Sequence, residues 1–230
     1  MESRFLRELF GGWTRFEKVY ISVLVLLQLV VFYLNPESPV GVIAGVSGVL
    51  CVTFVAKGKI SNYFFGFIQI ILYLLLSIEY VLYGEVLLNV FYLIMQVIGV
   101  SVWRKNMTNK AVEENTVVEV KSLSTKQWIV TLIGLVVAWY VFGRMFDYFN
   151  SNSPYLDSIT TSLSVMAQIL MTWRYKEQWI LWIVVNVFSI ALWVVAGNAS
   201  MVAMWVAFLF NSSYGYYNWI RLSTLEKQSL

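Results

Sequence analysis

The chain has 230 residues, of which 59% are hydrophobic and 13% charged, and its mean hydropathy is +0.70. So few charged side chains cannot cover the surface that a soluble protein of this length exposes to water. The composition therefore excludes a soluble globular protein. The net charge is +3, the chain has no histidine, and Cys51 is its one cysteine. An intrachain disulfide and a metal site built from histidine and cysteine are therefore excluded, and we expect no cofactor.

The first 16 residues predict an amphipathic helix that lies on the membrane surface. One face of this helix carries apolar side chains, and the other carries arginines. The apolar run that follows has the length of a signal peptide, but no small-x-small cleavage site comes after it. We therefore interpret this run as a retained membrane anchor. The apolar face consists of Phe5, Leu6, Leu9, Phe10 and Trp13.

Eight apolar runs follow one another along the chain and predict eight transmembrane helices. A bilayer core of about 30 Å needs about 20 helical residues, and each run has nearly that length. Charged or turn-forming residues separate the runs, and all three prolines fall outside them. The predicted spans are residues 19–34, 40–56, 61–80, 86–103, 127–148, 156–173, 178–196 and 199–219.

The basic residues alternate strictly between the connections of these spans. Fifteen of the 16 Lys and Arg residues fall on one side of the membrane, and Arg144 alone falls on the other. Cytoplasmic segments retain positive charge, so this distribution predicts that both termini are cytoplasmic. The largest basic group lies in the polar connection from Arg104 to Lys126.

A shift of 117 residues aligns the chain with itself and places spans two to four on spans six to eight. Span five is a single crossing, so both triplets enter the membrane from the same side. Parallel repeats of this kind are typical of transporters that bind substrate near the midplane between the halves. We therefore predict an all-α integral membrane protein, with two three-helix repeats joined by a linker helix (3+1+3) and an extra N-terminal helix. The predicted segments are 1–38, 39–104 for the first bundle, 105–155 for the linker, 156–220 for the second bundle, and 221–230 for the cytoplasmic tail.

Six spans carry one polar side chain at similar, middle depth. Interhelical hydrogen bonding would explain any one of these residues. Their shared depth favours a polar, uncharged cavity, because a polar group facing lipid is costly. The six residues are Ser47, Gln69, Gln96, Gln168, Asn186 and Asn211.

Aromatic side chains share helical faces with these amides. Trp179, Trp182 and Asn186 follow each other at i, i+3 and i+7, and Tyr73 lies one turn beyond Gln69. The middles of the spans contain no Asp, Glu, Lys or Arg, which argues against proton coupling and favours a neutral or delocalised cationic ligand. An intramembrane enzyme is disfavoured because the spans contain no nucleophile-base pair or acidic dyad. A purely structural membrane protein stays open as an alternative.

Three segments resemble the bacterial PnuC transporters of nicotinamide riboside. They are residues 60–66 (ISNYFFG), residues 169–172 (ILMT) and the Trp-x-x-Trp-x-x-x-Asn motif that ends at Asn186. The similarity runs from about Gly45 to Arg221. It implies a SWEET-like membrane transporter, commonly a homotrimer, which moves its vitamin by facilitated diffusion while a cytoplasmic kinase traps the product.

The resemblance assigns substrate contact to Trp182 and Asn186, which match the motif. Gln69, Tyr73, Gln96, Gln168, Asn211 and Trp179 extend the predicted site by depth, helical face and repeat symmetry. Related carriers take thiamine or riboflavin, so these vitamins remain alternatives. The resemblance also places the chain in the bacterial inner membrane, and nothing in it indicates an enzyme or a nucleic-acid partner.

Overall fold

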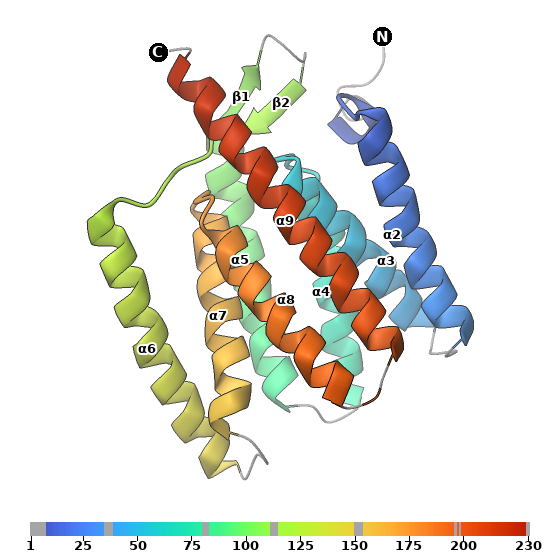
Figure 1. The fold of residues 1–230 in the computed structure, drawn as a ribbon, viewed down its shortest axis with the longest axis vertical. Coiled ribbons are helices and arrows are strands. Elements are labelled where there is room, and N and C mark those ends of the chain that lie inside the picture. Colours follow the sequence, from blue (N-terminus) through green and yellow to red (C-terminus); the bar gives the residue numbers. More distant parts are fainter. Residues whose placement is uncertain are drawn as a thin grey trace. The chain divides into compact units, whose positions relative to one another are not determined.

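The chain folds into a series of long helices (Figure 1). The computed structural model describes residues 8–34, 39–79, 83–110, 115–149, 154–195, 197 and 199–228. Residues 1–7 of the predicted amphipathic segment, including Phe5 and Leu6, lie outside the described residues. The helices are α2 (Arg15–Leu34), α3 (Pro39–Ala56), α4 (Asn62–Glu79), α5 (Tyr83–Lys105), α6 (Thr125–Tyr148), α7 (Pro154–Thr172), α8 (Gln178–Val195) and α9 (Ala199–Gln228).

Six of the described helices, α2 to α6 and α8, are long and apolar enough to cross a membrane. The chain is therefore a multi-pass membrane protein. Helices α7 and α9 coincide with the other two predicted spans, but their composition is more polar, so the number of eight spans stays a prediction. Helix α9 continues beyond the predicted end of its span at Trp219, into the segment predicted as a tail.

The helix starts follow from local chemistry. Pro39 and Pro154 are the first residues of α3 and α7. A proline costs no hydrogen bond there, because it lacks a backbone N–H and an N–H at this position would have no acceptor within the helix. Helix α6 begins with a capping box, in which Ser124 and Gln127 bond each other's backbone N–H. These two prolines thus mark helix starts and produce no kinks in the described spans.

The polar connection after α5 is not wholly irregular. Strands β1 (Met107–Lys110) and β2 (Asn115–Val118) pair antiparallel, with Met107 opposite Val118. The all-α prediction therefore needs one addition, a two-stranded hairpin in the segment predicted as a linker. The hairpin was not visible in the sequence because its strands are four residues long and carry no apolar alternation.

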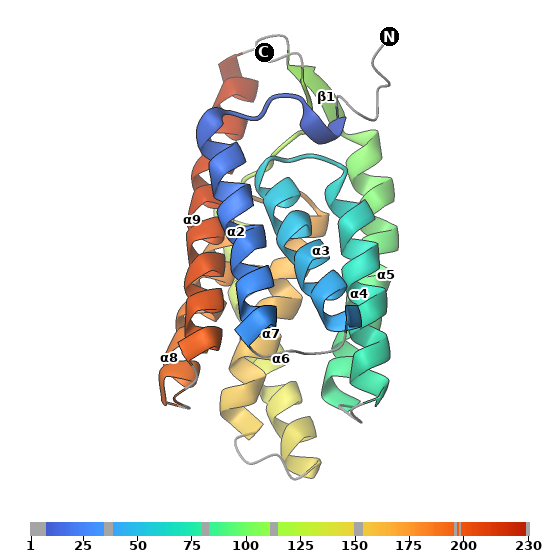
Figure 2. The ribbon, with the colours of Figure 1, turned by 90° about the vertical axis from the view of Figure 1, so that its right-hand side faces the viewer.

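The chain divides into two compact units, residues 1–119 with 217–230, and residues 120–216. In the first unit α2 packs on α3, α3 on α4, and α4 on α5 (Figure 2). In the second unit α7 packs on both α6 and α8. Gln28 of α2 reaches Gly45 of α3, where its Oε1 would lie 3.0 Å from a Cβ. Gln28 therefore packs against α3 within the chain.

The repeat is visible in the backbone, but its register is 116 residues and not 117. Six hydrogen bonds around the α3–α4 turn recur around the α7–α8 turn with this shift; Gly58 N–H to Val55 O, for example, corresponds to Arg174 N–H to Met171 O. The predicted pairing of Lys57 with Arg174 is therefore wrong by one residue. Charges around a turn do not define its register, whereas the residue with positive φ does, and this residue is Gly58 in one turn and Arg174 in the other.

Candidate functional site

Asn186 lies near the middle of α8 and is 3% exposed. Its Nδ2 donates a hydrogen bond to Oγ of Ser212 on α9, at 2.8 Å. The Ser212 hydroxyl in turn donates to the carbonyl of Phe208, one helical turn earlier, at 2.9 Å. Sequence reasoning missed Ser212, although it directly follows the predicted residue Asn211. The sequence signal that could have identified Ser212 is a hydroxyl in the middle of the last predicted span, at about the depth of Asn186.

Trp182 precedes Asn186 by one turn of α8 and is partly buried. It packs against a cluster of buried apolar residues from α7 and α8, which consists of Ala167, Leu170 and Leu181. The side chain is thus held by this cluster, while part of its surface remains accessible. A ring held this way can offer a face to a flat ligand.

Trp179 has a different environment from Trp182. It is 2% exposed, and its ring lies on Gly215 of α9, where a Cβ would come within 2.6 Å of a ring carbon. Trp179 therefore sets the spacing of α8 and α9. Gln168 on α7 and Asn211 on α9 are also buried, at 8% and 2% exposed.

In the first unit, the structure gives the predicted residues unequal environments. Gln96 of α5 is 2% exposed, and its amide occupies the space above Gly66 of α4, where a Cβ would lie 2.0 Å from Nε2. Among the described residues no donor reaches the Oε1 of Gln96. Gln69 of α4 is partly buried and contacts Gly48 of α3, whereas Tyr73 is 39% exposed.

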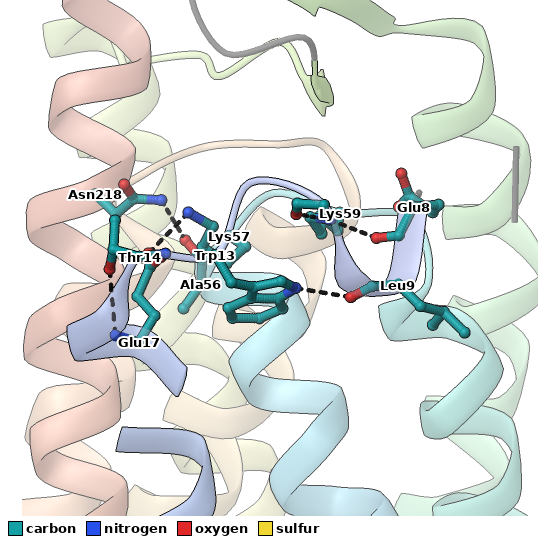
Figure 3. Close-up of polar contacts among 10 residues, drawn as sticks. Glu8, Leu9, Trp13, Thr14, Glu17, Ala56, Lys57, Lys59 and Asn218 are labelled. Atoms are coloured by element: carbon teal, nitrogen blue, oxygen red, sulfur yellow. Dashed lines mark hydrogen bonds and ion pairs between the residues drawn. The ribbon is translucent and has the colours of Figure 1, made fainter. Parts of the chain in front are cut away.

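A second polar group surrounds the α3–α4 turn (Figure 3), and sequence reasoning did not single it out. The carboxylate of Glu17 forms an ion pair with Lys57 at 2.7 Å, with both side chains buried. Its other oxygen accepts the backbone N–H of Thr14, whose hydroxyl accepts the N–H of Glu17. This capping box, Thr-x-x-Glu before an apolar run, is the sequence signal that could have identified Glu17.

Lys59 lies in the same turn and is 1% exposed. Its ammonium donates hydrogen bonds to the backbone carbonyls of Glu8 and Gly11 in the N-terminal segment. Burial lowers the pKa of Lys59 to about 8, with the neighbouring Glu8 acting in the opposite direction. This group therefore fastens the N-terminal segment to the turn with charges that are nearly removed from water.

Comparison with known proteins gives a consistent result. Residues 38–221 match the family described as "Nicotinamide mononucleotide transporter". Nicotinamide riboside transporter PnuC of Neisseria mucosa is 45% identical over 94% of this chain and 85% of its own length. The protein of the same name from Haemophilus influenzae is 38% identical over 96% of this chain and 97% of its own length. The crystal structure of the vitamin B3 transporter PnuC has a TM-score of 0.85 at 42% identity, and covers 97% of this chain and 98% of that one.

Proposed function

We propose that this chain, which belongs to the nicotinamide mononucleotide transporter family, transports nicotinamide riboside across the bacterial inner membrane. The family description refers to the nucleotide, whereas the relatives from Neisseria mucosa and Haemophilus influenzae are nicotinamide riboside transporters. The observation that carries the proposal is the partly exposed Trp182 ring one turn from the buried amide of Asn186.

These two side chains suit the riboside. Its pyridinium ring is flat and cationic, and stacking on a tryptophan contributes about 0.5 to 2 kcal/mol. Its carboxamide and ribose hydroxyls need donors and acceptors together, and an asparagine supplies both. A phosphate requires arginine or lysine for tight binding, and neither residue occurs in α7 or α8. We therefore favour the nucleoside over the nucleotide as substrate.

The proposed transport is uniport by alternating access, with both termini cytoplasmic. Helix α8 contains no ionisable residue that could act as a proton relay beside Asn186. Phosphorylation of the riboside by a cytoplasmic kinase would keep the internal concentration low and drive net uptake. We further propose a homotrimer as the assembled form.

We include the remaining predicted residues in the proposed substrate site, and their burial and contacts support them to different degrees. Gln96 has the strongest support, because a buried carbonyl oxygen without a donor is costly unless a ligand or water satisfies it. Asn211 and Gln168 are buried amides on α9 and α7, while Gln69 and Tyr73 are less buried. Trp179 acts through helix packing against Gly215.

Calorimetry on the purified, detergent-solubilised protein tests the proposal. We expect Asn186→Ala to weaken nicotinamide riboside binding by about 5- to 150-fold, the effect of removing a buried hydrogen-bonding group. Trp182→Ala should weaken it by about 2- to 30-fold through the lost ring contact. The exposed Ser213→Ala serves as a control and should bind like the wild type. Unchanged affinity in both site variants would refute the proposed site.

A transporter of thiamine or riboflavin is the alternative function. A thermal-shift panel of nicotinamide riboside, nicotinamide mononucleotide, thiamine and riboflavin separates the candidates, and stabilisation by the riboside alone is expected. Uptake into sealed liposomes without an imposed gradient tests uniport. A requirement for a proton or sodium gradient would contradict that part of the proposal.

A further inference from the structure

We infer that Ser212 is a specificity-determining residue, which orients the carboxamide of Asn186 so that the site selects a ligand carboxamide over a carboxylate. The inference rests on the proposed function, because it assumes that Asn186 contacts the nicotinamide group. It adds a residue outside the Trp-x-x-Trp-x-x-x-Asn motif, together with a chemical reason for selectivity.

The Ser212 hydroxyl has a single proton to donate. Ser212 Oγ lies 2.9 Å from the carbonyl of Phe208, which can only accept a hydrogen bond. The hydroxyl must therefore donate its proton to that carbonyl. Toward Asn186, at 2.8 Å, the same oxygen is left with lone pairs and can only accept.

The Ser212 hydroxyl also fixes the orientation of the Asn186 amide. An asparagine amide has a donating and an accepting end, and the hydrogen-bond network decides which end points where. Because Ser212 accepts, the Nδ2 end must face it. Rotating the amide by half a turn would place its carbonyl oxygen against the Ser212 lone pairs. Burial of both residues, at 3% and 4% exposed, prevents water from relieving that repulsion.

With Nδ2 held by Ser212, the Oδ1 of Asn186 points away from the hydroxyl. It therefore offers an acceptor to a ligand N–H. A nicotinamide group carries such a donor, whereas a nicotinate group has only acceptor oxygens and a negative charge, which Oδ1 repels.

The first unit lacks this pair. With the 116-residue register, Ile70 stands at the position of Asn186 and Gln96 at that of Ser212. Neither an oriented asparagine nor a serine hydroxyl is therefore present at the corresponding place. The first unit therefore does not repeat the oriented amide of Asn186.

The test compares nicotinamide riboside with nicotinic acid riboside, which differs only in carrying a carboxylate. Affinities of both are measured by calorimetry on the purified full-length protein. The wild type should prefer the carboxamide, and Ser212→Ala should reduce this preference by about tenfold, because the freed amide can then present its N–H₂ to a carboxylate. The reduction should come largely from improved binding of the acid, which a general loss of packing would not produce.

Matched variants separate orientation from packing. Ser213 has the same hydrogen bond to the carbonyl four residues earlier, at 2.9 Å to Leu209, but is exposed. Ser213→Ala should therefore keep the wild-type preference. Ser212→Thr retains a hydroxyl that can bond the carbonyl of Phe208, and it should also keep the preference for the carboxamide. Valine has nearly the same shape as threonine but no hydroxyl, so Ser212→Val should lose this preference. The Thr and Val pair decides the question even if the alanine variant does not fold.

The outcomes are distinguishable from failure of the proposed function. A wild type that does not bind nicotinamide riboside would refute the proposed function itself. A wild type that binds it, with an unchanged preference in Ser212→Ala and Ser212→Val, would overturn the role of Ser212 and leave the transport function standing.

Discussion

The α3–α4 turn and the α7–α8 turn share one backbone design but differ in the side chains around it. In both turns a residue with positive φ, Gly58 at 68° or Arg174 at 70°, uses its carbonyl to accept a backbone N–H from the connection that follows α5. The donors are Val118 and Lys121. Backbone hydrogen bonds therefore preserve the repeat, because they depend on conformation and not on the side chain.

The helices beyond the turns repeat their packing as well. Tyr63 lies on Gly99 in the first unit, and Trp179 lies on Gly215 in the second, again 116 residues apart. One turn further along the chain the resemblance ends, since Gly66 stands where the second unit has Trp182. The space above Gly66 is taken by the amide of Gln96. The two units therefore keep a common scaffold and have diverged where ligand contact is proposed.

The N-terminal segment adds a second difference, since it covers the first turn. Trp13 packs edge-on against Phe54 at 5.2 Å, and its ring lies 5.6 Å from the ammonium of Lys57 and 5.5 Å from that of Lys59. Together with Glu17, this ring compensates two buried positive charges.

Glu17→Ala should cause the largest loss of stability, because it leaves Lys57 buried without its carboxylate and removes one of the two hydrogen bonds of the capping box at the start of α2. Breaking one side of a buried pair costs about 3 to 5 kcal/mol. The thermal unfolding midpoint of the purified protein measures it. Asp147→Asn is the matched control, since the Arg144–Asp147 pair is more than half exposed and should contribute at most about 1 kcal/mol. Equal shifts in the two variants would contradict the structural role of Glu17.

Gly215→Ala should lower stability by about 1 to 3 kcal/mol, because the added methyl group overlaps the rigid Trp179 ring and forces α8 away from α9. Binding of nicotinamide riboside should weaken in parallel, as Asn186 and Ser212 lie on these two helices. Gly134→Ala is the control, because its methyl group meets only the flexible end of Met166. A Gly215 variant with wild-type stability and affinity would show that the close packing is not required.

The pH dependence of stability should show a small contribution from Lys59. Its pKa is lowered to about 8 in the folded protein, from 10.5 for an unperturbed lysine. Between these values the unfolded chain binds the proton and the folded protein does not, so this group makes stability rise with pH above about 8. The difference in unfolding midpoint between the wild type and Lys59→Met should therefore change from pH 7.5 to pH 10. A constant difference would mean that the amine titrates normally.

Much of the architecture was predictable from the sequence because hydropathy acts over whole segments. Burying an unpaired backbone in lipid is so costly that an apolar run of nearly 20 residues must form a helix. The helix positions followed from such runs, the existence of the repeat followed from aligning the chain with itself, and the family followed from short segments that include the motif around Trp182 and Asn186. The register of the repeat did not, because one residue with positive φ decides it and an arginine occupies that place in the second turn.

Of the candidate site, residue types and depth were predictable, whereas partners were not. An asparagine at mid-depth indicates a polar contact, yet nothing in the local sequence shows that its amide faces Ser212, which is 26 residues away. The same holds for Glu17 and Lys57, which are 40 residues apart.

The sequence by itself thus determined a multi-pass helical protein with a repeat and a polar, aromatic motif in one helix. The tertiary structure decided which groups pair, how close the helices approach at glycines, and which way the amide of Asn186 points. The physical reason is that hydropathy and helix formation are properties of contiguous segments, while a hydrogen bond's direction depends on what a distant segment places opposite it.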